Sequence, residues 1–164
     1  MTRQRGESQM TDVPGFDFDT ILKTSPIVLG MTEDSPEAVF SRLFDSMVAA
    51  GCLSAGLREK ARAAVNAREA AGCTALANGI AIPHGYLDEV ERPVAAIGVH
   101  ARGVDCSSID GQPSRIFILL LNRQGSRDHI RFLAAVNRRL IIPEVRAGIL
   151  VAPTRDDVLR LLAG

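Results

Sequence analysis

A short apolar run that ends in a histidine constrains this chain more than any other stretch. It reads Gly79-Ile80-Ala81-Ile82-Pro83-His84-Gly85. Alternate isoleucines would lie on one face of a short strand, and Pro83 biases the residue before it toward an extended conformation while it removes one backbone donor. Gly85 would let the chain turn without a Cβ. The pattern predicts that His84 stands at a strand end, held by rigid backbone on one side and open on the other, which suits a nucleophile better than a packing residue.

Two longer strand candidates follow, at residues 94–100 and 115–122. The second contains the continuous run Ile116 to Leu121, which is apolar on both faces. Such a run is typical of a central strand that helices cover on both sides. Short apolar pieces between residues 16 and 29 predict a docking segment and are compatible with a first strand.

Cap residues and apolar stripes predict the helices. The expected helices run from Pro36 to a stop at Gly51, from about 57 to 71, from an N-cap at Ser126 to about 141, from 143 to 150, and from Thr154 through 162. At 164 residues and 46% hydrophobic content, the chain fits one globular domain with a substantial core. Residues 1 to 15 are polar and aperiodic, so we expect a flexible N-terminal tail followed by one domain at 16–164.

The overall charge and the cysteines narrow the function classes. Nineteen basic and nineteen acidic residues give a net charge of zero, so nothing in the charge balance calls for nucleic acid or an anionic membrane. Cys52, Cys73 and Cys106 are odd in number and lack CxxC spacing, which argues against a disulfide framework and a zinc site. The longest apolar run is too short to span a bilayer. We therefore expect a cytoplasmic protein with no direct membrane insertion.

Three histidines are the remaining candidates for chemistry. His100 ends a strand pattern, and we expect it to be structural or simply exposed. His84 and His129 each lie where an element meets a loop, a place where a rigid scaffold can present a side chain. His129 would fall in the first turn of a helix, where the dipole disfavours its cationic form. It could be merely solvated, but a neutral imidazole that donates one hydrogen bond there is also a suitable neighbour for a phosphoryl group.

Two other chemistries stay open from the residues alone. A cysteine-histidine hydrolase could use Cys73 and His84, although no nucleophile elbow or oxyanion-hole motif surrounds Cys73. A metal site could draw three ligands from His84, His129 and Asp128, although the chain has no HExxH spacing. A Walker A motif and a GxGxxG fingerprint are both missing from the sequence, which disfavours direct nucleotide use.

The stretch from Asn78 to Gly85 resembles the phosphohistidine motif of the mannitol/fructose-type EIIA domains of the bacterial phosphotransferase system, a group that includes the nitrogen-regulatory EIIA branch. Other features follow in the order of that family: the pair Arg68-Glu69 before Thr74, then Asp128-His129-Ile130 opening a helix, then a leucine-rich C-terminal helix. The resemblance covers roughly residues 16 to 164.

The resemblance implies an α/β single domain with a mixed central sheet flanked by helices on both sides. It implies a phosphotransferase component in which His84 accepts a phosphoryl group from an HPr-like phosphodonor and passes it to an EIIB-like acceptor, with His129 as a supporting hydrogen-bond partner and Arg68 stabilising charge. Positioning and charge stabilisation supply most of the catalysis in such a transfer, so no cofactor, ATP or metal is expected. A nitrogen-branch regulator that binds target proteins according to phosphorylation state shares this site. A binding module of the same fold without phosphotransfer is a further alternative.

The sequence departs from the family pattern at two places. Cys73 stands where small hydroxyl residues are common in relatives. The loop from Asn122 to Arg127 is more basic than expected, since Arg123 and Arg127 flank the approach to His129. These arginines predict either an altered choice of partner or assistance to an anionic phosphoryl group.

Overall fold

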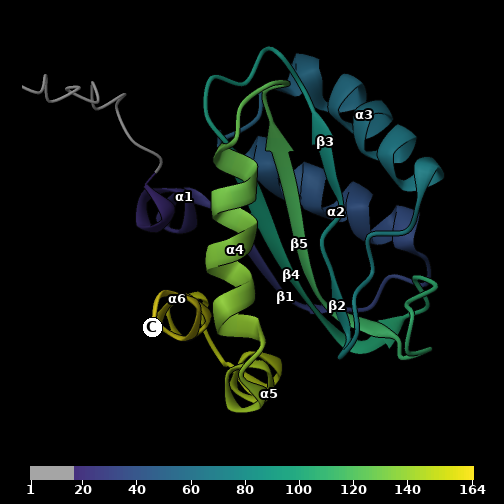
Figure 1. Ribbon diagram of the computed structural model, residues 1–164, viewed down its shortest axis with the longest axis vertical. Helices are drawn as coiled ribbons and strands as arrows, with labels where there is room; N and C mark the ends of the chain where they lie inside the picture. Colours follow the sequence, from purple (N-terminus) through teal and green to yellow (C-terminus); the bar gives the residue numbers. More distant parts are fainter. Residues whose placement is uncertain (1–16) are drawn as a thin grey trace, which may run out of the picture.

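The computed structural model describes residues 17–164, and within them six α-helices flank a five-stranded sheet (Figure 1). The tail predicted at residues 1 to 15 lies outside the described residues. The helices are α1 (Phe18–Thr24), α2 (Pro36–Ala49), α3 (Arg58–Ala71), α4 (Asp128–Leu140), α5 (Pro143–Val151) and α6 (Arg155–Ala163), with one 3-10 turn, η1 (Ala55–Leu57). The strands are β1 (Ile27–Met31), β2 (Ile80–Ala81), β3 (His84–Tyr86), β4 (Val94–Val104) and β5 (Ser114–Asn122).

The sheet mixes parallel and antiparallel pairs. Its order is β1-β4-β5-β2, and β3 also pairs with β5. Strand β1 runs parallel to β4, β4 runs antiparallel to β5, and both β2 and β3 run parallel to β5. The α/β single domain with a mixed sheet is therefore confirmed.

Strand β5 divides the core into two halves, because alternate side chains of a strand point to opposite faces. Phe117, Leu119 and Leu121 belong to the half that α2 and α3 cover. The isoleucines and leucine between them, at 116, 118 and 120, belong to the half that α1, α4, α5 and α6 cover (Figure 1). All six side chains are at most 1% exposed. The prediction of a central strand covered on both sides is confirmed, and within residues 17–164 no helix combines the length and apolar character that crossing a membrane requires.

The predicted helix caps agree with the structure at two helices and differ at one. Ser35 accepts a hydrogen bond from the backbone N–H of Ala38 at 3.2 Å and caps α2, as predicted. Thr154 likewise caps α6 through Asp157 N–H. The predicted cap at Ser126 is wrong by one residue: α4 begins at Asp128 behind Arg127, and Ser126 Oγ accepts only from Asp128 N–H, at 3.2 Å.

The segment predicted to dock before the first strand contains a helix. Asp17 Oδ1 accepts a hydrogen bond from Asp19 N–H at 3.1 Å and caps α1, and Ile21 and Leu22 are buried in the core. A carboxylate at an N-cap position was visible in the sequence. The predicted first strand forms directly afterwards as β1.

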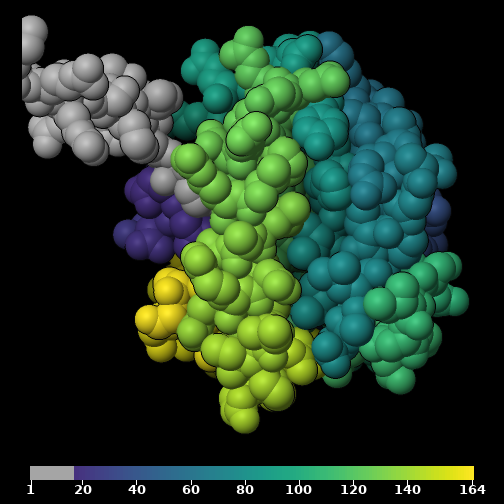
Figure 2. All heavy atoms as spheres, in the orientation of Figure 1, coloured from purple at the N-terminus to yellow at the C-terminus, as the bar shows by residue number. Residues whose placement is uncertain are grey.

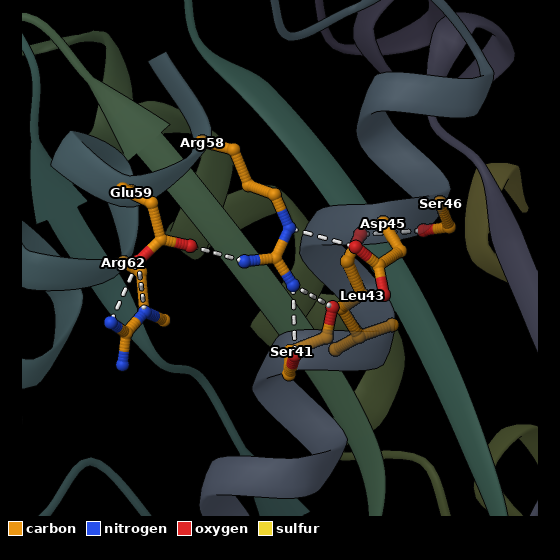
Figure 3. A network of polar contacts seen from close by, with 7 residues as sticks. All are labelled: Ser41, Leu43, Asp45, Ser46, Arg58, Glu59 and Arg62. Atoms are coloured by element: carbon orange, nitrogen blue, oxygen red, sulfur yellow. Dashed lines mark hydrogen bonds and ion pairs between the residues drawn. The ribbon is translucent and has the colours of Figure 1, made fainter. Parts of the chain in front are cut away.

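The start of α3 is fixed to α2 by one arginine (Figure 3). Arg58 Nε donates to Asp45 Oδ1 at 2.7 Å, and its Nη2 donates to Ser41 Oγ at 2.8 Å. A third donor, Nη1, reaches Glu59 Oε1 at 2.6 Å. The N–H donors of the planar guanidinium thus bind residues of both helices. These contacts orient α3, whose last turn carries Arg68.

The backbone around His84 differs from the prediction in one important respect. The chain does not turn at Gly85, because Gly85 lies inside β3 and pairs with Leu121 of β5. A Cβ at Gly85 would lie 2.8 Å from Val65 N and 2.9 Å from Ala64 C of α3. The glycine therefore permits α3 to approach the strand closely, and His84 is the first residue of β3 rather than the residue after a strand.

Candidate functional site

His84 presents one ring nitrogen to the protein and leaves the other free. Its Nδ1 lies 3.0 Å from the carbonyl oxygen of Ile82. In a neutral ring this carbonyl fixes the proton on Nδ1, because an oxygen acceptor requires a donor. Nε2 then carries the lone pair, and no hydrogen-bond partner for it exists among residues 17–164. The half-buried imidazole therefore has one ring nitrogen engaged by the backbone and one available to a ligand.

A groove of about 660 Å³ lies in front of this imidazole. Figure 2 shows the molecule hollowed between α4, in green, and the teal segments that carry β2 and β3. The walls are mainly apolar, with polar groups from His84, Arg68, Cys73, Thr74 and Asn137. Leu76 and Ile130 on the rim are 40% and 57% exposed. An open groove with an apolar lining and a few convergent polar groups is a typical binding site.

Arg68 lines the same groove from the end of α3. Its Nη1 donates to the carbonyl oxygen of Gly72 at 2.9 Å, so one nitrogen caps the helix that carries it. Within the part of the chain that the structure describes, this is the only hydrogen bond that its guanidinium makes. The other N–H groups remain available to an anion. The structure therefore places Arg68 and His84 at one cavity.

His129 lies in the first turn of α4, as predicted, but outside the residues that line the groove with His84. Its ring packs edge-on against Tyr86, with centroids 5.7 Å apart and an interplanar angle of 88°. Tyr86 follows His84 by two positions in β3, so both side chains lie on the same face of that strand. His129 Nδ1 faces Ser126 O at 2.9 Å and Asn122 Nδ2 at 3.0 Å.

Tyr86 and Asn122 were not singled out from the sequence. Tyr86 is 41% exposed beside His129, and Asn122 is 2% exposed behind it. A sequence signal existed for Asn122, because an amide directly after a run of six buried apolar residues is unusual in a core strand. No comparable signal marked Tyr86, since its contact with His129 depends on the pairing of β3 with β5.

The remaining histidine, His100, is structural, as one of its two predicted readings states. It is 2% exposed, its Nε2 lies 2.8 Å from Glu33 O, and its Nδ1 accepts from Gly103 N–H at 2.8 Å and Arg102 N–H at 3.2 Å. Both ring nitrogens are occupied by backbone groups. His100 has no free nitrogen for chemistry.

The cysteine-histidine alternative finds no support in the contacts of Cys73. The thiol donates to Cys106 O at 2.6 Å and accepts from Ala75 N–H at 3.2 Å. It shares the groove lining with His84 but forms no hydrogen bond with it among residues 17–164. Burial raises the pKa of the neighbouring Cys106 thiol to about 11, which makes its reactive thiolate scarce near neutral pH.

The described residues do not show the ligand geometry that the alternative of a metal site requires. Across the described range 17–164, no three His, Cys, Asp or Glu side chains lie together in a way that could hold a metal ion. Asp128, its proposed carboxylate, lies 3.9 Å from Arg131 instead. The two arginines of the basic loop, Arg123 and Arg127, are exposed, and neither forms an ion pair within the described residues.

Comparison with known proteins places this arrangement in a family. Residues 20–164 match the family model described as "Phosphoenolpyruvate-dependent sugar phosphotransferase system, EIIA 2". The chain is 32% identical over 152 residues to a fructose-specific EIIA component from Haloferax volcanii, covering 90% of this chain and 97% of that protein.

Solved structures agree on the fold. The nitrogen regulatory protein IIA-Ntr of Neisseria meningitidis superposes with a TM-score of 0.79 at 25% identity, over 88% of this chain and 97% of that one. Mannitol EIIA from Escherichia coli, in its complex with phosphorylated EIIB, superposes with a TM-score of 0.72 at 23% identity, over 84% and 94%. The mixed sheet, the histidine-bearing strand and the match over residues 20–164 lead to one conclusion: this chain belongs to the EIIA type 2 family of the phosphotransferase system.

Proposed function

We propose that this protein is a phosphocarrier whose His84 accepts a phosphoryl group from phospho-HPr and passes it to an EIIB partner. One observation carries the proposal: His84 has its Nδ1 bonded to Ile82 O and its Nε2 without a partner among residues 17–164, in a groove that it shares with Arg68. Its membership of a family of sugar phosphotransferase EIIA components supports the same reaction class.

The transfer requires two in-line displacements. In the first, the Nε2 lone pair of His84 attacks phosphorus, an N–P bond forms, and the N–P bond to the donor histidine breaks. In the second, a nucleophile on the acceptor, such as a cysteine thiolate, forms a bond to phosphorus and His84 leaves as neutral imidazole. Charge on the equatorial oxygens is stabilised by the free N–H groups of Arg68 and by a hydrogen bond from His129.

His84 starts each cycle with the tautomer that the first step needs. The proton on Nδ1 remains bonded to Ile82 O, so the nucleophilic nitrogen needs no separate base to remove a proton. The ring acquires positive character as the new bond forms, and the carbonyl oxygen at 3.0 Å stabilises it through the Nδ1–H dipole.

Labelled phosphate provides the test. Phosphoenolpyruvate, Enzyme I and HPr from the same source would be mixed with wild-type protein and with His84→Ala and His129→Ala variants. We expect acid-labile label on wild type, none on His84→Ala, and transfer slowed about 10- to 100-fold in His129→Ala, the value of one hydrogen bond to a charged oxygen. Absence of label on folded wild-type protein would favour a binding module without phosphotransfer.

A second candidate is a nitrogen-branch regulator that uses the same site. The superposition on the Neisseria meningitidis nitrogen regulatory protein, at a TM-score of 0.79, favours it. Copurification with a sugar permease component would support the transport role, whereas retention of a target protein that depends on the phosphorylation state of His84 would support the regulatory role.

A further inference from the structure

A buried amide lies directly behind His129. Asn122, the last residue of β5, is 2% exposed. Its Nδ2 lies 3.0 Å from His129 Nδ1, 3.1 Å from Arg123 O and 3.4 Å from Ser126 O. Its Oδ1 is buried without a hydrogen-bond partner among residues 17–164. A buried polar atom without a partner calls for a physical explanation.

The orientation of the amide supplies that explanation. With the NH2 group toward the loop, its hydrogens find acceptors in the carbonyl oxygens of Arg123 and Ser126 whichever nitrogen of His129 is protonated, and only Oδ1 is left over. A rotation by half a turn would place Oδ1 against the carbonyl oxygens of Arg123 and Ser126 and would bury an NH2 group without acceptors. Two opposed oxygens and two unused donors are worse than one unused acceptor. The NH2 group therefore faces His129.

The position of the NH2 group decides where His129 carries its proton. One hydrogen serves Arg123 O, and the other points at His129 Nδ1, which is nearer than Ser126 O. A proton on Nδ1 would set two N–H groups against each other at 3.0 Å. Ser126 O, 2.9 Å from the same nitrogen, favours the opposite tautomer. When Nδ1 carries no proton, the Asn122 hydrogen directed at it is shared with this oxygen, which lies 3.4 Å from Nδ2.

We propose that Asn122 is a positioning residue that holds neutral His129 in its Nε2–H tautomer, so that His129 can donate a hydrogen bond to the phosphoryl group. The two histidines are then complementary: His84 offers a bare Nε2 and His129 offers an Nε2–H. The role in transfer depends on the proposed phosphocarrier function, whereas the tautomer does not.

Nitrogen-15 NMR of full-length protein with labelled histidine tests the tautomer. A ring nitrogen that carries a proton and one that does not resonate far apart, and His129→Ala assigns the signals. We expect Nε2 of His129 to be protonated and Nδ1 bare in wild type, and the proton to move to Nδ1, toward Ser126 O, in Asn122→Leu. Asn122→Ala is the second variant if the leucine is not tolerated.

Ser114→Ala is the matched control, because Ser114 is also buried in β5, at the other end of the strand, and its Oγ has no hydrogen-bond partner in the described part of the chain. The His129 signals of the Ser114→Ala variant should equal those of wild type. A protonated Nδ1 in wild-type His129, or a tautomer unchanged in both Asn122 variants, would overturn the assignment. This readout requires no phosphorylation.

The second measurement is the rate of transfer from phospho-HPr. We expect Asn122→Leu to slow it roughly tenfold, the value of one hydrogen bond, while Ser114→Ala keeps the wild-type rate. If the His129 tautomer shifts in Asn122→Leu but the rate of transfer stays at the wild-type value, Asn122 has no role in transfer. Wild-type protein that accepts no phosphate would overturn the phosphocarrier function and this role together, and the NMR result would still decide the tautomer.

Discussion

His100 on β4 and His84 on β3 stand in one sheet, yet the fold engages their ring nitrogens differently. Backbone groups occupy both nitrogens of His100, which is 2% exposed. A backbone carbonyl occupies only Nδ1 of His84, and the ring borders a groove of about 660 Å³. A histidine with both nitrogens satisfied contributes to stability, whereas one with a single nitrogen fixed by the fold has its other nitrogen ready for chemistry.

The largest change in stability is expected at His100. His100→Ala removes the partners of Glu33 O and of two backbone N–H groups, and we expect it to lower the free energy of unfolding by about 2–4 kcal/mol. Urea denaturation measures this loss, and the folded fraction should still accept phosphate at the wild-type rate. Loss of phosphorylation in folded His100→Ala would contradict the division of roles between the two histidines.

A smaller loss is expected at the close contact behind His84. Gly85→Ala places a Cβ 2.8 Å from Val65 N, which forces α3 away from β3, and we expect a cost of about 1–3 kcal/mol in the free energy of unfolding. Gly56→Ala is the control, since its Cβ would meet only Ser54 Oγ at 3.9 Å. Equal stability of the two variants would show that the close approach of α3 is not what fixes the strand.

The smallest change in stability is expected at the groove itself. Arg68→Ala loses one hydrogen bond, to Gly72 O, so the free energy of unfolding should fall by less than about 1 kcal/mol. The rate of phosphoryl transfer should fall about 100-fold, because a preorganised donor to the transferring group is lost. Assays in which phosphoryl transfer is quenched at successive times measure this rate for wild type and for the variant. An unchanged rate would remove Arg68 from the site.

The same contrast explains what the sequence could predict. The run Ile116 to Leu121 predicts a central strand, because a strand that is buried on both faces needs an unbroken apolar sequence. The caps at Ser35 and Thr154 are equally local signals. The carboxylate cap at Asp17 was available as well, but a helix as short as α1 offers too little apolar periodicity to be recognised.

Features that depend on pairing between distant segments could not be predicted. Gly85 resembles a turn glycine in the sequence, and only the position of α3 shows that it permits close packing. The contact between the rings of Tyr86 and His129 depends on the register of β3 against β5. The tautomers of the two histidines depend on single carbonyl and amide groups that the fold brings to them.

We propose that the fold gives His84 a single reactive nitrogen. The most direct measurement is to identify the phosphorylated atom, by phosphorus and nitrogen NMR of protein phosphorylated through HPr. The contact between Nδ1 and Ile82 O predicts the phosphoryl group on Nε2 of His84. Phosphate on Nδ1 of His84, or on any other residue of the folded wild-type protein, would contradict the account.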